Sequence, residues 1–344
     1  GNGGSSPNYL TNVNGTLYFQ AYTPTNGYEL WKIDPITGTP SVINIVSGSG
    51  SSSPSNLTNV NGILYFQAYT PTTGYELWKL DPVNDLPVLV SDIYPGVNSS
   101  SPSNFINSGG TVYFIANNGT NGTELFRINP TTGNPVLLDI RAGVNGSNPN
   151  NLIDVNGTLY FIANDGINGS ELWKVDPTTG NPVLLEINPG SSSANINYLT
   201  NVNGTLYFQA YDPTNGTELW KIGTNGTPTR IDLGNGGSSP NYLTNVNGTL
   251  YFQAIGYNGA NYLGYELWKI DPTTGNPVVI DIVSGSGSSY PSNLTNVNGT
   301  LFFQAYNSTS GYELWKLDNN GNPVLVKDIY SGNNSSSPSN LFNV

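Results

Sequence analysis

The phrase Glu-Leu-Trp recurs along this chain at a nearly constant interval, with phenylalanine replacing tryptophan in the third copy. Neighbouring copies are 47 or 48 residues apart. The seven glutamates are Glu29, Glu76, Glu124, Glu171, Glu218, Glu266 and Glu313. A fixed period of this length is the signature of a repeat architecture, so each period is expected to be one structural unit.

Each repeat is predicted to contain four short strands. In the second repeat, the apolar runs 56–60 and 63–69 flank Asn61-Gly62, a strong signal for a two-residue hairpin turn. Runs 75–80 and 87–90 follow after Gly- and Pro-containing breaks, and a longer polar segment then leads to the next repeat. Four-stranded antiparallel units of this length are typical of β-propeller blades. The sequence therefore predicts an all-β fold, a single propeller over residues 1–344 with seven blades.

The end of the chain complicates this count. Residues 336–344 repeat the start of a blade and predict a spare innermost strand, an eighth copy of a strand that needs only seven. Residues 1–21 are also identical to residues 234–254, five repeats later. This second period predicts a longer parental array, and pairing of the spare strand with a neighbouring subunit is one way to accommodate it.

Charge and composition exclude several functions. The 344-residue chain has 10 basic and 22 acidic residues, a net charge of −12, so it lacks the basic surface expected of a nucleic-acid-binding protein. No apolar run is long enough to cross a bilayer. The chain contains no histidine and no cysteine, which excludes Ser-His-Asp and Cys-His catalysis and conventional zinc sites.

Carboxylates remain as candidates for chemistry, but most recur in every repeat, which favours a structural role and no enzyme activity. Each repeated glutamate is followed three residues later by a base. These bases are Lys32, Lys79, Arg127, Lys174, Lys221, Lys269 and Lys316. Residues three apart on a strand point to opposite faces, so we expect ion pairs between neighbouring blades. The alternative is that the lysines extend to the rim while the glutamates accept backbone hydrogen bonds.

Two kinds of ligand site are suggested by the loops. The loop between the second and third strands of the sixth repeat is longer than its counterparts and contains tyrosines, so Tyr257, Asn258, Tyr262 and Tyr265 are candidates for carbohydrate binding, with core packing as the alternative. Loops 164–168 and 318–322 offer oxygen ligands for calcium, and Asx turns explain them equally well. No other cofactor or metal is predicted.

Many asparagines stand in Asn-X-Ser/Thr sequons. Several, such as Asn14, Asn203 and Asn247, belong to the predicted Asn-Gly hairpin turns, which explains them without glycosylation. The sequons that serve as glycosylation candidates are at Asn98, Asn118, Asn121, Asn168, Asn215, Asn307 and Asn334.

The repeat resembles a known family. Residues 13–19, the phrase at 74–79 and residues 326–329 are similar to the ELW-type repeats, sometimes described as hyalin-like, of large bacterial surface and secreted proteins. The Asp-Gly-Thr that commonly follows the phrase in that family is replaced here by Asp-Pro, as at Asp34-Pro35. The resemblance implies a propeller and an extracellular or cell-surface location, but no established activity.

These observations predict an extracellular structural or adhesive scaffold that self-associates or contacts neighbouring repeats, and that forms a filament or surface layer by strand exchange. The alternative is a glycan-binding propeller. A carboxylate-dependent carbohydrate-active enzyme is the third hypothesis.

Overall fold

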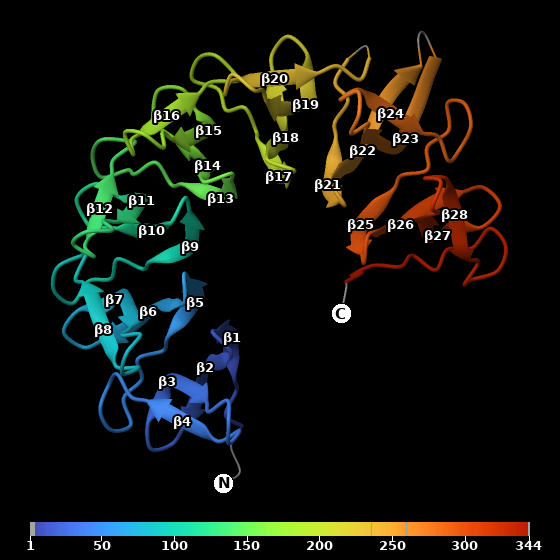
Figure 1. Ribbon diagram of the computed structural model, residues 1–344. Coiled ribbons are helices and arrows are strands. Elements are labelled where there is room, and N and C mark those ends of the chain that lie inside the picture. Colours follow the sequence, from blue (N-terminus) through green and yellow to red (C-terminus); the bar gives the residue numbers. More distant parts are fainter. Residues whose placement is uncertain (1–3, 235, 259–260, 343–344) are drawn as a thin grey trace. The chain divides into compact units, whose positions relative to one another are not determined.

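The fold is all-β. The computed structural model describes residues 4–234, 236–258 and 261–342, with Asn258 described by its backbone alone. Within these residues there is no helix, and the strands form seven four-stranded antiparallel sheets, each ordered as in the sequence (Figure 1). This confirms the predicted fold class, in which each sheet is one propeller blade.

The strands of the first four sheets are β1 (Asn8–Val13), β2 (Thr16–Thr23), β3 (Gly27–Ile33) and β4 (Pro40–Ile43); β5 (Ser55–Val60), β6 (Ile63–Thr70), β7 (Gly74–Leu80) and β8 (Pro87–Ser91); β9 (Ser103–Ser108), β10 (Thr111–Asn117), β11 (Thr123–Ile128) and β12 (Pro135–Leu138); and β13 (Asn150–Val155), β14 (Thr158–Asn164), β15 (Ser170–Val175) and β16 (Pro182–Leu185). The strands of the last three sheets are β17 (Asn197–Val202), β18 (Thr205–Asp212), β19 (Gly216–Ile222) and β20 (Pro228–Ile231); β21 (Asn241–Val246), β22 (Thr249–Asn258), β23 (Asn261–Ile270) and β24 (Pro277–Ile280); and β25 (Ser292–Val297), β26 (Thr300–Asn307), β27 (Gly311–Leu317) and β28 (Pro323–Lys327).

The chain forms two compact units. The first comprises Gly1–Ile167 and Trp173–Val183, and the second comprises Asn168–Leu172 and Leu184–Val344. The first unit contains sheets β1–β4, β5–β8 and β9–β12, and the second contains β17–β20, β21–β24 and β25–β28. The boundary between the units falls within sheet β13–β16.

The first hairpin of each sheet is closed by the predicted Asn-Gly turn. In the first sheet, Asn14 and Gly15 have φ of 50° and 88°, and Asn61 and Gly62 of the second sheet have 52° and 80°. A two-residue turn of this type needs positive φ at both positions, and asparagine and glycine tolerate it best. The sequence therefore predicted both the position and the reason for these turns.

Neighbouring sheets pack through one recurring contact. In the first unit, Leu30 packs in one cluster with Phe66, and Leu77 packs in the next cluster with Phe114. Phe66 pairs with Trp78 across the hairpin, whereas Leu77 pairs with Gln67, so phenylalanine and leucine lie on opposite faces of the same sheet. The leucine of one sheet thus meets the phenylalanine of the next.

The second unit uses the same contact between Leu219 and Phe252 and between Leu267 and Phe303. All these leucines and phenylalanines are fully buried. Burial of one such side chain contributes about 1.5–3 kcal/mol, which makes this contact a main source of cohesion between sheets.

The first strands of neighbouring sheets also lie side by side within each unit. Side chains connect them to backbone groups of the adjacent strand. In the first unit, Thr11 Oγ1 donates to the Leu57 carbonyl at 3.0 Å, and Asn59 Nδ2 donates to the Asn12 carbonyl at 3.0 Å. In the second unit, Thr244 Oγ1 donates to the Leu294 carbonyl at 3.4 Å. These bonds explain why Thr and Asn recur in the first strand of most repeats.

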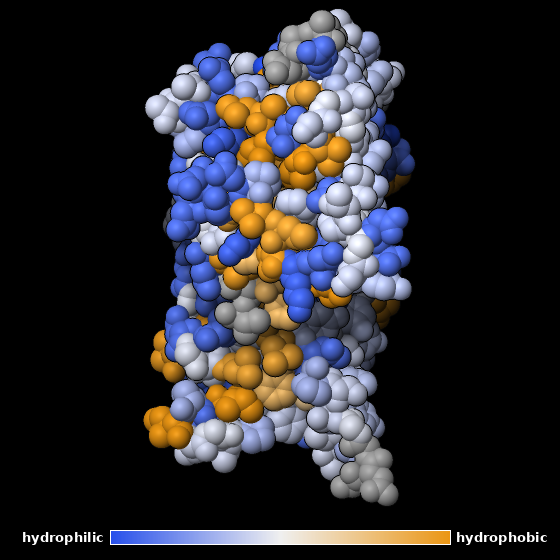
Figure 2. Space-filling model, turned by 90° about the vertical axis from the view of Figure 1, so that its right-hand side faces the viewer, coloured by the Kyte–Doolittle hydropathy of each residue, from blue (hydrophilic) through white to orange (hydrophobic). Residues whose placement is uncertain are grey.

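The terminal sheets are less covered than the others. Phe19 of the first sheet and Leu314 of the last are only partly buried, whereas the equivalent residues of the other sheets are fully buried. Figure 2 shows that hydrophobic residues gather in patches between polar residues on the face that it draws. Apolar surface therefore remains exposed on this molecule.

The predicted spare strand is not formed within residues 336–342. This segment still follows the path of a first strand, because Thr295 Oγ1 donates to the Leu341 carbonyl at 3.3 Å as its counterparts do between sheets. Asn340 also keeps the positive φ, 54°, of its counterpart Asn293. What is missing is a second strand to form a ladder, so the repeat sequence alone does not produce a strand here.

Candidate functional site

The repeated glutamates close the loops that follow the fourth strands. In the first sheet, the Glu29 carboxylate accepts hydrogen bonds from the Ile45 amide at 2.9 Å and the Ser52 amide at 3.0 Å. The Ser52 hydroxyl donates a further bond at 2.6 Å. Glu29 is fully buried. The carboxylate thus replaces solvent for loop groups that would otherwise be buried without partners.

The same arrangement, which we call the glutamate clamp, recurs with a serine hydroxyl in six repeats. The pairs are Glu29–Ser52, Glu76–Ser100, Glu124–Ser147, Glu218–Ser238, Glu266–Ser289 and Glu313–Ser336. The serine lies 20 to 24 residues after its glutamate. Sequence analysis missed these serines, although an alignment of the repeats on glutamate would have shown them.

One clamp lacks its hydroxyl. The residue equivalent to the serine is Ala194, which is fully buried. Glu171 keeps the Ile187 amide as a donor at 2.8 Å, but its Oε1 is buried without a hydrogen-bond partner among the described residues. This repeat is therefore a natural variant of the clamp.

Burial raises the pKa of six of the seven repeated glutamates, and Glu313 is the exception. Desolvation raises the pKa of Glu29, Glu76 and Glu124, while the serine and amide donors oppose the rise. Desolvation raises the pKa of Glu171, Glu218 and Glu266 further, to about 7. Glu171 lacks the serine donor and Glu218 also has an unpartnered Oε1, which accounts for part of the difference.

The clamp corrects the predicted glutamate–lysine ion pairs. The six serine-paired glutamates are bound by their own loops, and Glu171 likewise accepts from Ile187. Two of the bases contact groups other than the repeated glutamates. Lys32 Nζ binds Asp85 Oδ2 at 2.7 Å, and Arg127 lies against Gly180. The alternative, in which the glutamates accept backbone hydrogen bonds, describes the glutamates better, whereas Lys32 and Arg127 extend toward the next sheet and not toward the rim. The spacing of residues on one strand did not show that the loop after the fourth strand donates hydrogen bonds to the glutamate.

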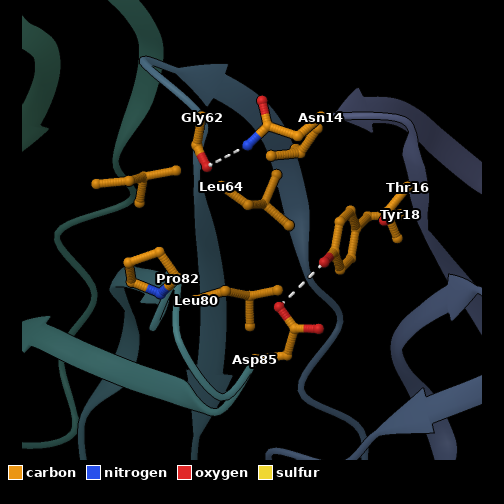
Figure 3. Close-up of a pocket in the computed structure, with 10 residues that line it drawn as sticks. Asn14, Thr16, Tyr18, Gly62, Leu64, Leu80, Pro82 and Asp85 are labelled. Atoms are coloured by element: carbon orange, nitrogen blue, oxygen red, sulfur yellow. Dashed lines mark hydrogen bonds between the residues drawn. The ribbon is translucent and has the colours of Figure 1, made fainter.

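Asp85, the partner of Lys32, lines a cavity of about 170 Å³ in the first unit, and Figure 3 shows this cavity. Tyr18 Oη donates to Asp85 Oδ1 at 3.2 Å. Burial, together with the Asp85 charge and this hydrogen bond, raises the pKa of Tyr18 to about 12. Asp85 has φ of 57° at a position where other repeats carry glycine, such as Gly38. The aspartate therefore accepts an unfavourable backbone conformation and binds the preceding sheet.

Similar cavities recur at the equivalent place between other neighbouring sheets of each unit, with volumes of about 160 to 310 Å³. Each lies between an Asn-Gly turn and the loop before the fourth strand. Small-molecule sites are commonly about 300–1,000 Å³. The size and repetition of these cavities favour grooves between blades over a dedicated ligand pocket.

The predicted carbohydrate-binding tyrosines do not form one cluster of their own. Tyr257 and Tyr262 face each other across the β22–β23 hairpin, with ring centroids 5.7 Å apart. Tyr265 instead stacks on Tyr290, with centroids 5.5 Å apart and an interplanar angle of 29°. The side chain of Asn258 lies outside the described residues. Tyr290 was not singled out by sequence analysis.

The predicted glycosylation candidates lie in the loops, except Asn307, which is the last residue of β26, and several have amide groups that are already bonded. Asn118 Nδ2 donates to Asn121 Oδ1 at 3.1 Å, Asn121 Nδ2 to Asp139 at 2.7 Å, and Asn215 Nδ2 to Asp212 at 3.0 Å. Asn334 Nδ2 donates to the Ser331 carbonyl at 3.3 Å, and Asn307 Oδ1 accepts from Thr309. Asn98 is exposed and Asn168 is partly buried. Glycosylation stays a prediction.

The turn asparagines have a structural task. Asn14, Asn203 and Asn247 each donate their side-chain amide to a glycine carbonyl of the next sheet, at 3.2 to 3.4 Å. This supports the interpretation of these sequons as hairpin signals.

The loops considered for calcium are organised by their own backbone. Asp318 Oδ1 accepts from the Asn320 amide at 2.9 Å and the Asn322 amide at 2.8 Å, and Asp165 Oδ1 accepts from the Ile167 amide at 2.8 Å. Among the described residues there is no group of three or more acidic side chains that could hold a metal ion. Calcium binding stays a prediction.

No described helix offers a long apolar segment of the kind that spans a bilayer.

No protein-family model and no curated protein sequence matches this chain. Many solved structures are similar to it at low identity. One is a puromycin-hydrolyzing peptidase from Mycobacterium tuberculosis, 14% identical, with 94% of this chain and 53% of that one covered and a TM-score of 0.43. A prolyl endopeptidase is 13% identical, with 94% and 49% covered and a TM-score of 0.48. The chain thus spans about half the length of these peptidases.

A third similar structure is the β-propeller domain of the Trilobed protease from Pyrococcus furiosus, 10% identical, with 97% and 98% of the chains covered and a TM-score of 0.40. These three similar structures are peptidases or a peptidase propeller, which contradicts the function predicted from the sequence. We therefore do not retain the structural or adhesive scaffold, the strand-exchange filament or the glycan-binding alternative. The resemblance to ELW-type repeats stays a prediction.

Proposed function

We propose that this chain is a noncatalytic propeller module that binds a polypeptide partner. The observation that carries the proposal is the glutamate clamp. The most regularly repeated carboxylates are buried and bonded within their own loops, so they serve the loops and not a substrate. The chain also has no histidine or cysteine.

The clamps hold one end of each sheet, which we call the loop end: the loops between the second and third strands together with the loops after the fourth strands. Tyrosines are paired at this end, as in Tyr22–Tyr28 and Tyr69–Tyr75 of the first unit and Tyr306–Tyr312 of the second. Their ring centroids are 5.0 to 5.2 Å apart. Tyrosine is enriched in protein interfaces because it combines a large apolar surface with one hydrogen-bonding group.

The approach of the clamped loop fixes the position of these tyrosines. Gly74 has φ of +68°, and a Cβ there would lie 2.1 Å from the Asn98 carbonyl oxygen. Glycine is therefore needed beside Tyr75, whose amide donates to the Ser99 hydroxyl oxygen at 2.9 Å. A rigid support of this kind lowers the entropy cost of binding a flexible peptide.

A propeller of this kind would be suited to accompany a separate catalytic domain, as in the similar peptidases, and to contact the polypeptide that such a domain handles. The proposal for this chain rests on the loop end and the clamp.

The test is to incubate the purified chain with an array of immobilised peptides of defined sequence and, separately, with quenched fluorogenic peptides. We expect selective peptide binding without hydrolysis. Peptide hydrolysis that is lost in Glu76→Gln would contradict the noncatalytic role, and the absence of any selective binding would contradict peptide recognition.

A further inference from the structure

Tyr290 breaks the repeat at the loop end of the second unit. It has φ of 46°, at a position where all the other repeats carry serine or asparagine with similar φ. These residues are Ser6, Ser53, Ser101, Asn148, Asn195, Ser239 and Ser337. Positive φ is unfavourable for a bulky residue, and such strained residues concentrate at functional sites. Tyr290 is also 44% exposed, so burial in the core does not explain its presence.

The backbone around Tyr290 joins two neighbouring sheets. The Ser289 and Tyr290 amides both donate to the Tyr265 carbonyl on β23, at 3.0 and 3.1 Å. The Tyr306 amide of β26 donates to the Ser289 carbonyl at 2.7 Å. Ser289 is also the serine of a glutamate clamp, since its hydroxyl binds Glu266 at 2.6 Å. Tyr290 is therefore held between Tyr265 of one sheet and Tyr306 of the next.

Four rings are gathered by this connection, and we call Tyr265, Tyr290, Tyr306 and Tyr312 the tyrosine patch. Tyr265 stacks on Tyr290, and Tyr306 lies 5.2 Å from Tyr312 at an interplanar angle of 51°. Burial raises the pKa of Tyr312, and the nearby Tyr290 and Tyr306 raise it further, in agreement with the backbone connection between the two pairs. Tyr265, Tyr306 and Tyr312 are partly buried, so part of each residue remains accessible to solvent.

Carboxylates lie near the tyrosine patch. Glu313 directly follows Tyr312, and exposed Asp281 is close enough to Glu266, the residue after Tyr265, to raise its pKa. Burial raises the pKa of Glu266 to about 7, so Glu266 itself is only partly ionised near neutral pH. Lys269 and Lys316 stand four residues from those tyrosines along the strands, about 13 Å away toward the opposite end. Lys327, at the end of β28, is the exposed base of these two sheets at the loop end. The net charge of the chain, −12, has the same sign as the carboxylates.

We propose that the tyrosine patch binds arginine or lysine side chains of a basic peptide, with the cation stacked on the ring of Tyr290. Cations are attracted to the faces of aromatic rings, and surrounding carboxylates strengthen this attraction. The inference rests on the proposed peptide-binding function and adds the charge of the partner and the place where it binds.

The first unit contains a matched site without the additional tyrosine. The Ser53 amide donates to the Tyr28 carbonyl at 3.0 Å, and the Tyr69 amide donates to the Ser52 carbonyl at 2.7 Å. Tyr69 and Tyr75 form the same tilted pair, 5.2 Å apart. The backbone connection is therefore the same, but serine occupies the position of Tyr290, so this site is an internal control.

The experiment measures binding of a fluorescein-labelled peptide of alternating glycine and arginine by fluorescence anisotropy, at low salt and at about 150 mM salt. The matched probe is the same peptide with citrulline, which keeps the shape of arginine and removes its charge. We expect the arginine peptide to bind the wild type more tightly than the citrulline peptide. Tyr290→Ser should weaken arginine binding about threefold to fivefold, whereas Tyr290→Phe should keep most of it because the ring remains.

Tyr290→Ser restores the common residue of the repeat and relieves the strain, so its unfolding midpoint should equal or exceed that of the wild type. Ser53→Tyr should create a second site and increase the amount of arginine peptide bound at saturation. Arginine binding that Tyr290→Ser leaves unchanged would overturn the inference, because it would reflect only the net charge of the chain. Equal binding of the arginine and citrulline peptides would overturn the proposal of a cationic partner but not that of peptide recognition. If no peptide of any composition bound, both proposals would be overturned.

Discussion

The glutamate clamp makes a specific prediction at its one incomplete copy. Ala194→Ser introduces the hydroxyl that six other repeats supply, at a fully buried position beside Glu171. Serine exceeds alanine by one oxygen atom, and the equivalent loops accommodate it. A hydrogen bond to a charged group contributes about 1.5–3 kcal/mol, so we expect a gain of about 1–2 kcal/mol above pH 7, where Glu171 is ionised.

The assay has a global and a local part. The urea midpoint should rise, and the Ile187 amide, which donates to Glu171, should exchange with solvent more slowly. The gain should shrink near pH 5, where the carboxyl is protonated in the parent. Ser147→Ala is the matched control and should lower the midpoint by a similar amount. The idea that the hydroxyl completes the clamp would be refuted by one combination of results. In it, Ala194→Ser leaves the urea midpoint and the exchange rate of the Ile187 amide unchanged, while Ser147→Ala lowers the midpoint.

Three further outcomes follow from the packing and the charges. Phe208→Ala should lower the free energy of unfolding by about 3–5 kcal/mol because Phe208 is fully buried. Phe19→Ala should lower it less because Phe19 is only partly buried, and equal unfolding midpoints of the two variants would contradict this difference in burial. Asp85→Gly should change stability by less than about 1 kcal/mol, because the partly exposed pair with Lys32 is weak and glycine relieves the positive φ; a larger loss would show a stronger pair. The urea midpoint should fall as pH rises from about 4.5 through 7. Glu171, Glu218 and Glu266 have a pKa of about 7 in the folded protein and 4.5 in the unfolded chain, so folding favours their protonated form. A midpoint that rose over this interval would contradict the burial of these carboxyl groups.

The repeat sequence was sufficient for the fold because several local signals agree. Asn61-Gly62 marks a turn that needs positive φ, and apolar residues on both faces of the second strand require a neighbouring sheet on each side. The spare strand at residues 336–342 was predicted wrongly because the sequence of a strand does not supply its partner.

The interactions of the carboxylates were harder to predict. Strand geometry correctly placed Glu29 and Lys32 on opposite faces, but it did not show that a loop 23 residues later returns to Glu29. Asp85 and Tyr290 were not predicted, because the predictions rest on residues that the repeats share and both of these residues are exceptions to the repeat. Comparison of each position with its counterparts would have found both, although only the structure shows that their φ is positive.

Titration of the glutamate carboxyl groups tests the clamp most directly. The chain has eight glutamates, seven in the repeated phrase and Glu186, so a sample labelled with carbon-13 at the glutamate carboxyl should give few, resolvable NMR signals. We predict that Glu171, Glu218 and Glu266 titrate at about 7 and that Ala194→Ser lowers the value for Glu171 alone. If all eight carboxyls titrated near the ordinary value of about 4.3, they would be solvated and available for chemistry, and the clamp would be contradicted.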